Sequence, residues 1–273
     1  MSKRQRWISI AVFAVILALL LVGIILTGGH GSHESIGEVM KDAVLHEVNR
    51  IDLFGLAVNP GLIAAFAVTG IMTVFCVLVR IFVIPKFRNV PGKFQLLLEE
   101  AVGFFDNLAR ANSPHSHGFL SAYIFTAGAY IFVGTLFELL GLQAVTTQGH
   151  SVVLPAPLSD INGAIALALL SYSVILIGGL IKNGPKGMLT ALKDFSMPIS
   201  MSFRLFGALL SGALVTELVY YYSALSFVLP VIVGVLFTLI HAIVQTYVLT
   251  MLVSVSFGES TERHAKKATK PKG

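Results

Sequence analysis

Long apolar runs without charged residues alternate with short polar segments along this chain. Four such runs occupy residues 7–27, 61–79, 118–137 and 161–181. A helix needs about 20 apolar residues to cross the roughly 30 Å hydrocarbon core of a bilayer, because each residue rises about 1.5 Å. Each run therefore predicts a membrane-spanning helix.

The longest stretch without Asp, Glu, Lys or Arg covers residues 218–258, which is too long for one upright helix. Together with 199–216 it predicts two long helices that break around 220–226, with Pro230 in the first turn of the second. A helix over 230–257 would be about 42 Å long, more than the hydrocarbon core requires. We therefore expect an all-α polytopic membrane protein with five or six membrane helices, of which the two long C-terminal helices are strongly tilted.

Composition agrees with a membrane protein. Of 273 residues, 55% are hydrophobic and 12% are charged, and the mean hydropathy is +0.83. Soluble proteins carry roughly a quarter charged residues. The net charge of +5 does not indicate nucleic acid, because the basic residues lie in short loops and at both ends rather than on one face. A single cysteine, Cys76, excludes a disulfide framework and a cysteine metal site.

Positive charges are unevenly divided between the two sides of the predicted membrane. Sixteen of the 19 Lys and Arg residues fall in segments on one side, whereas only Lys41 and Arg50 fall on the other. Lys and Arg in short loops stay in the cytoplasm. The distribution predicts six spans with both chain ends in the cytoplasm.

The first span has a second interpretation, since a basic head followed by an apolar stretch is also typical of a secretory signal peptide. Its long apolar run and the lack of an A-x-A site favour a retained signal-anchor, and cleavage would leave five spans. The chain then divides into an N-terminal signal-anchor helix and linker (1–33), a membrane channel domain (34–258) and a basic cytoplasmic tail (259–273).

Two connecting segments predict amphipathic helices at the membrane surface. Apolar residues recur at helical spacing over 94–109, and Glu99, Glu100 and Asp106 lie off that face. Residues 36–44 show the same pattern more weakly. A helix in the headgroup layer explains both segments better than a recognition role does.

One cation, Arg204, lies inside a predicted span. An arginine there costs at least about 2.5 to 3.5 kcal/mol and cannot lose its proton. It either extends to the cytoplasmic surface or faces a carboxylate or a water-filled cavity. The residues three and four positions apart along its face are small, namely Gly207, Ala208, Ser211, Gly212 and Val215. Such a face suits close packing against a helix of a separate subunit or of this chain.

Few other polar groups are predicted within the membrane. They are Glu138, Asp160, Asn162, Glu217, His241 and Gln245. Glu138, Asp160 and Glu217 lie toward the outer side of the predicted topology, and together with Arg204 they suit an ion pathway. Each alone could be an interhelical hydrogen bond, an interpretation that fits Gln245 better than Glu217. Glu217 lies about 20 Å along the helix from Arg204, so the two cannot pair.

Four motifs carry a family resemblance. They are Val90-Pro-Gly-Lys-Phe-Gln95, Pro157-Leu-Ser-Asp-Ile-Asn162, Arg204-Leu-Phe-Gly207 and Gln245. Over about residues 52–258 the sequence resembles subunit a of the F-type ATP synthases, the stator channel subunit of the membrane sector. The arginine motif on a long penultimate helix is the specific match.

Two departures from this family affect the ion route. Family members commonly have asparagine where this chain has Ala208, and Glu or His where it has Ala213. The family's acid or histidine on the last helix would fall on Thr238. Because Glu217 and His241 are expected near one membrane depth, we interpret them as a relocated version of that pair.

The resemblance implies the function. An ion, expected to be a proton, enters from outside through a half-channel near Glu138, Asp160, Asn162, Glu217 and His241 and neutralises a carboxylate of a rotating ring of small two-helix c subunits. It leaves through a second half-channel, and Arg204 promotes release and keeps the half-channels apart.

The resemblance also implies the setting of the chain. Its partners are the c ring, peripheral-stalk b subunits and the lipid bilayer, and its place is the bacterial inner membrane with a cytoplasmic C-terminus. Neither catalytic chemistry nor a cofactor is expected in this chain. The alternative is a stand-alone secondary ion transporter, whose folds often show an internal repeat that we do not find between the two halves.

Overall fold

The computed structural model describes residue 22 and residues 51–53, 56–114, 116–145, 151–221 and 229–262. Most of the predicted signal-anchor segment, the weak amphipathic segment 36–44 and the tail beyond residue 262 lie outside the described residues. The connection at 222–228 lies outside them as well.

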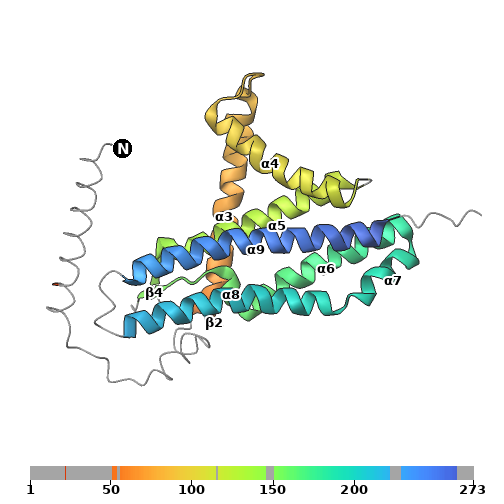
Figure 1. The fold of residues 1–273 in the computed structure, drawn as a ribbon. Helices are drawn as coiled ribbons and strands as arrows, with labels where there is room; N and C mark the ends of the chain where they lie inside the picture. The colour runs from red at the N-terminus through yellow and green to blue at the C-terminus, as the bar shows by residue number, and fades with distance from the viewer. Residues whose placement is uncertain are drawn as a thin grey trace, which may run out of the picture.

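The described chain is built mainly of helices (Figure 1). The α-helices are α3 (Pro60–Leu78), α4 (Lys93–Asn112), α5 (His117–Phe137), α6 (Ile161–Asn183), α7 (Pro185–Lys193), α8 (Ser196–Tyr221) and α9 (Leu229–Thr261). Short helical turns are η1 (Val79–Val83), η2 (Ile84–Lys86), η3 (Glu138–Leu140) and η4 (Pro157–Ser159). The strands are β1 (Ile51–Leu53), β2 (Leu56–Val58), β3 (Gln143–Val145) and β4 (Ser151–Val153).

The predicted polytopic all-α fold is confirmed. Four helical stretches in the described part are long and apolar enough to cross a membrane: Pro60–Lys86, His117–Leu140, Ile161–Asn183 and Gly234–Thr261. The fifth predicted span corresponds to α8. The strands form two antiparallel ribbons, β1–β2 and β3–β4, which the sequence did not predict because three-residue strands are too short to show alternation.

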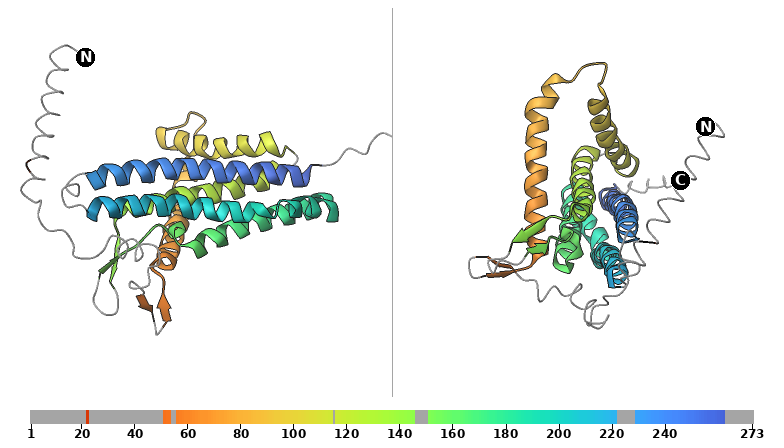
Figure 2. Two further views of the ribbon diagram at one scale, coloured as in Figure 1. Left: turned by 60° about the horizontal axis from the view of Figure 1, so that its bottom comes forward. Right: turned by 90° about the vertical axis from the view of Figure 1, so that its left-hand side faces the viewer.

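The two C-terminal helices dominate the shape of the molecule. They lie side by side and antiparallel, and both run across α3 rather than along it (Figures 1 and 2). With 33 residues α9 is about 50 Å long, and α8 with 26 residues is about 39 Å long, so both exceed the hydrocarbon thickness. The predicted length of both helices is confirmed.

The ends of these helices follow the sequence with two exceptions. The first is that α8 begins at Ser196, three residues before the predicted start. α8 ends at Tyr221, and α9 begins at Leu229 with Pro230 in its first turn, as predicted. α9 continues past Gly258, however, to Thr261. The Thr261 hydroxyl donates to the Phe257 carbonyl oxygen at 2.7 Å and helps to hold this last turn in place.

The shared core lies between α5, α6, α8 and α9. Its buried side chains include Leu120, Ile124, Ile131, Ile175, Leu205, Leu249, Val253 and Phe257. The amphipathic segment forms α4 as predicted, and Phe105 and Ala109 bury its inner face. Many large apolar side chains face outward instead, such as Phe66 on α3, which is 72% exposed. Outward apolar surface of this kind is typical of helices in contact with lipid.

The C-terminal end of α9 is tied to the ends of α4 and α6, an arrangement that we call the α9 clamp. Asn112 at the end of α4 donates to the Ser254 hydroxyl at 3.2 Å, and Asn183 at the end of α6 donates to the Ser260 carbonyl at 3.0 Å. Gly178 packs against the Phe257 ring, and Gly258 packs against the main-chain oxygen of Asn112. The clamp brings the ends of three helices together without a charged pair.

Candidate functional site

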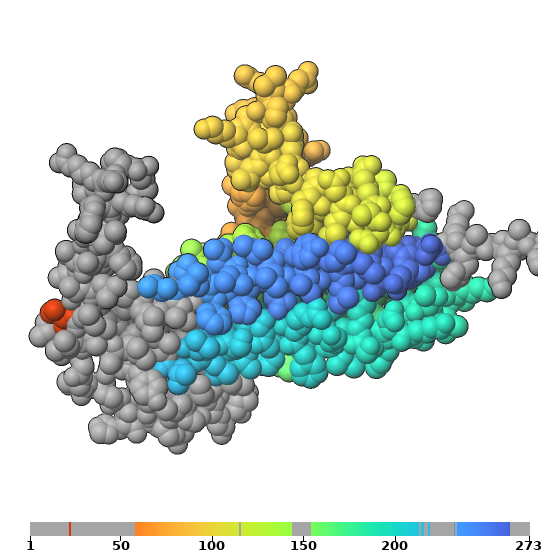
Figure 3. Space-filling model, in the orientation of Figure 1, coloured from red at the N-terminus to blue at the C-terminus, as the bar shows by residue number. Residues whose placement is uncertain are grey.

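Arg204 lies on the outer face of α8. The opposite face of this helix is buried through Met201, Leu205 and Leu209, whereas the Arg204 side chain is exposed. A Cβ atom added at Gly207, one turn further on, would meet no described atom within 4 Å. The described helices of this chain therefore do not pack over the small-residue face at this level, and α8 and α9 present one continuous surface there (Figure 3).

Gln245 fixes how α8 and α9 sit against each other. Its side-chain Nε2 donates to the main-chain oxygen of Arg204 at 3.1 Å, and the Gln245 side chain is buried. Gln245 is the middle residue of the 33-residue α9. The interhelical hydrogen bond expected of this residue is present, and it places the arginine level with the centre of the longest helix.

His241 lies one turn from Gln245 toward the start of α9. Its Nδ1 is 2.7 Å from the Phe237 carbonyl oxygen, and its ring stacks on the Phe237 ring with centroids 5.8 Å apart. Because a carbonyl oxygen can only accept, Nδ1 carries the proton of this bond, and Nε2 of the neutral ring is left as an acceptor. The histidine is thus oriented by its own helix and can receive a proton on Nε2.

The hydrogen bond from Gln245 to Arg204 also fixes where His241 and Glu217 lie along the helix axes relative to Arg204. In two antiparallel helices, His241 lies about 6 Å from the level of Arg204, beside Ala208, while Glu217 lies about 20 Å from it. Along the helix axes Glu217 and His241 are therefore roughly 14 Å apart, because four residues along α9 and thirteen along α8 cover unequal distances. That they share one membrane depth and replace the family's usual pair stays a prediction. The Glu217 side chain itself lies outside the described part of α8.

Asp160 serves as a helix cap. Its Oδ1 accepts from the main-chain N–H of Asn162 at 3.1 Å and from the Asn162 side chain at 3.3 Å, which caps α6. Its Oδ2 accepts from Asn59 Nδ2 at 3.2 Å. Asn59 in turn caps α3 by accepting from the Gly61 N–H at 2.9 Å. Two helix starts are thus joined through one pair of side chains.

Sequence reasoning missed Asn59, although a signal for it was present. An Asn directly before a Pro marks a helix start, and Pro60 indeed opens α3. That Asn59 also bonds to Asp160, 101 positions away, depends on tertiary structure that the local pattern does not contain.

We expect Asp160→Ala to destabilise the protein by about 2 kcal/mol, because it removes an N-cap and leaves Asn59 without its partner. Asp160→Asn keeps a side-chain oxygen for the cap and should cost less than half as much. Thermal unfolding of the purified variants measures both effects. In the double variant with Asn59→Ala the two losses should not add, and strict additivity would contradict the link between the caps.

Glu138 occupies the turn that follows α5. It opens η3, which contacts α9 and ends at Gly141 with a left-handed φ of 55°. The structure therefore brings Glu138 near α9, joins Asp160 and Asn162 to each other and to α3, and joins Arg204 to Gln245.

No described carboxylate forms an ion pair with Arg204. Within the described ranges, the salt bridge that is present joins Arg110 and Asp106 on α4 at 2.6 Å. The hydrogen bond from Arg110 lowers the pKa of the Asp106 carboxyl. The same ranges contain no group of three or more His, Cys, Asp or Glu side chains that could hold a metal ion. The arginine is a fixed cation on an open face, without an acid of its own in the described structure.

One comparison bears on this geometry. The model of the family described as ATP synthase A chain matches residues 63–257. The match covers well over half of the 273 residues and includes Arg204, Gln245 and every described helix from α4 to α8.

Proposed function

We propose, from the premise that this chain belongs to the ATP synthase A chain family, that it carries protons through two half-channels along a rotating ring of c subunits. Family membership makes the chain a multi-pass membrane subunit of an ATP synthase with a role in ion transport. The path of the ion and the surface that meets the ring are the content of our proposal.

The observation that carries the proposal is the position of Arg204. It lies on an uncovered face of α8, level with the middle of α9, and its main chain is held there by Gln245. A cation in such a place needs an anion from outside the chain. A carboxylate on a passing ring helix supplies one and approaches closely over the small-residue face.

Arg204 would act on that carboxylate through its charge. At a separation of about 4 Å and an effective dielectric near 20, an ion pair contributes about 4 kcal/mol. This stabilises the ionised acid, lowers its pKa and expels its proton. Because the guanidinium itself does not release a proton, it also separates the two half-channels.

The proposed outer half-channel is based on the positions of Glu217 and His241 along α8 and α9. Glu217 lies nearest the far end of α8, and His241 lies one turn from the arginine level. We propose that they act in series, with Glu217 and Glu138 receiving the proton at the outer side and His241 Nε2 passing it to the ring. Asp160 and Asn162 shape the same outer side by capping α6.

Orientation in the membrane follows from the basic residues. The ends of α4 and α6 and the segment α7 contain Arg110, Lys182, Lys186 and Lys193, and the α9 clamp gathers these ends with the C-terminal end of α9. We propose that this end is cytoplasmic, in a bacterial inner membrane. The inner half-channel opens there, and b subunits of the peripheral stalk contact the remaining outer faces.

A cysteine cross-link tests the ring contact. In a Cys76→Ser background we expect Gly207→Cys to form a disulfide with cysteines placed along the outer helix of the c subunit, because position 207 is open on the Arg204 face. Oxidised membranes are analysed by gel electrophoresis for the joined pair.

The matched control is Leu170→Cys, which is 56% exposed and lies on α6 rather than α8. Cross-linking at 170 but not at 207 would contradict the proposed rotor face. Failure of the chain to copurify with any ring of small hydrophobic subunits would favour the stand-alone transporter.

A further inference from the structure

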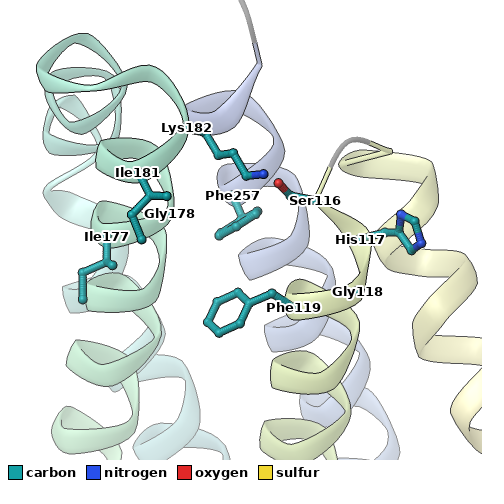
Figure 4. A pocket seen from close by; sticks show the side chains of 9 residues that line it. All are labelled: Ser116, His117, Gly118, Phe119, Ile177, Gly178, Ile181, Lys182 and Phe257. Carbon is teal, nitrogen blue, oxygen red and sulfur yellow. The ribbon is translucent and has the colours of Figure 1, made fainter.

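A pocket of about 450 Å³ opens between the start of α5 and the end of α6 (Figure 4). Phe257 of α9 lies behind it, and its lining includes Ser116, Phe119, Ile177, Ile181 and Lys182. His117 also borders the pocket, but its ring points away from it (Figure 4) and bonds to the Pro114 carbonyl oxygen at 3.0 Å. None of the residues proposed for the outer half-channel or the ring contact lines this pocket.

One end of the pocket offers hydrogen-bond donors and positive charge. Lys182 Nζ and Ser116 Oγ point toward one another across the opening (Figure 4). Ser116 Oγ is buried and has no hydrogen-bond partner among the described residues. Ser116 is also the N-cap residue of α5, but its side chain makes no capping hydrogen bond, so the first N–H groups of that helix add partial positive charge.

The lining contains no carboxylate to balance this charge. A buried hydroxyl without a partner costs about 1 to 3 kcal/mol, which an acceptor bound in the pocket would recover. The polar end is therefore suited to an anion with several acceptor oxygens, and a phosphate group has this chemistry.

The other end of the pocket is apolar and open to the outside of the bundle. Ile181 is 74% exposed, Phe119 is 63% exposed and Ile177 is 55% exposed. Both α5 and α6 belong to candidate membrane spans, and the pocket lies at the ends of those spans. At such a level the headgroups and the first part of the acyl chains surround a membrane protein.

We infer that this pocket binds one anionic phospholipid. Its phosphate lies between Lys182, the Ser116 hydroxyl and the first turn of α5, and an acyl chain runs down along Phe119 and Ile177. The positive charge of the site favours an anionic headgroup, and its apolar wall favours a phospholipid over free phosphate. The inference rests on the chain being a membrane protein and does not depend on the proposed ion path.

Lipid binding by the purified full-length chain in a neutral detergent tests this site. Phosphatidylglycerol is titrated while native mass spectrometry counts retained lipid and thermal unfolding reports stabilisation. We expect saturation at one tightly retained lipid, and about fivefold weaker binding in Lys182→Gln, since one cation near the surface contributes about that factor. Ser116→Ala should weaken binding in the same direction.

Lys186→Gln is the matched control, because Lys186 lies on α7 and does not line the pocket. If Lys186→Gln weakened phosphatidylglycerol binding as much as Lys182→Gln, the lipid would be held by the general positive charge of this end of the protein, and the proposed site would be wrong. Equal retention of phosphatidylcholine would overturn the charge selection, and displacement of the lipid by inorganic phosphate would show that the acyl wall contributes nothing. If a protein segment copurified with the chain and stayed bound in the pocket, the occupant would be a protein partner and the lipid proposal would be wrong.

Discussion

Arg204→Ala is expected to abolish ATP synthesis driven by a proton gradient. The substitution removes the charge that contributes about 4 kcal/mol to ionising the ring carboxylate, which corresponds to roughly a thousandfold loss in the rate of proton release. It also removes the barrier between the half-channels, so vesicles should leak protons faster. The measurement is ATP synthesis and passive proton flux in vesicles that contain the assembled complex.

Two further variants make this result specific. Arg204→Lys keeps a positive charge, but an ammonium can release its proton when buried, so only a small part of the activity should return. Arg110→Ala removes another arginine whose ion pair with Asp106 lies on the exposed side of α4, and it should change synthesis little. Synthesis at the normal rate in Arg204→Ala would remove the basis of the proposed mechanism.

The second large effect is a loss of folding caused by a substitution in the α9 clamp. Gly258→Val should prevent folding, because the new Cβ atom would collide with the main-chain oxygen of Asn112, which a side-chain rotation cannot move. Overpacking of this kind costs about 1 to 3 kcal/mol or more. The amount of chain recovered in membranes, and the Tm of any purified protein, measure the effect.

Gly178 provides the comparison within the same clamp. A Cβ atom there would collide with ring atoms of Phe257 and not with main chain, so Phe257→Leu should restore part of the stability lost in Gly178→Ala. Gly103→Ala on α4 is the control, since its Cβ would meet nothing within 4 Å, and it should be neutral or slightly stabilising. An equal loss at positions 103 and 258 would contradict close packing as the reason for glycine at position 258.

Much of the fold could be predicted because a bilayer imposes simple requirements. Apolar length and the lack of charge defined α3, α5 and α6, and Pro230 located the start of α9. The end of α9 was placed too early, at Phe257, since part of the bonding of its last turn comes from Asn183, which is distant in sequence. Asn183 is 77 positions from Ser260, and no periodicity of the sequence indicates that pairing.

The candidate site was predicted in its residue types but not in its geometry. Arg204 stood out because a charge in an apolar run is costly, and Gln245 was identified as a buried amide that needs a partner. That its partner is the main chain of residue 204 depends on the register of α8 against α9. The same register separates His241 from Glu217, which spacing within each helix could not reveal.

The hydrogen bond from Gln245 is accepted by the main-chain oxygen of residue 204, an atom that any amino acid would supply at this position. The alignment of the two long helices is therefore indifferent to the side chain that residue carries. Residues other than proline and glycine, which disturb the interior of a helix, could be compared at this position for transport in chains with the same helix alignment. The chemistry of the charge can thus vary, in evolution or in the laboratory, without disturbing the framework that presents it.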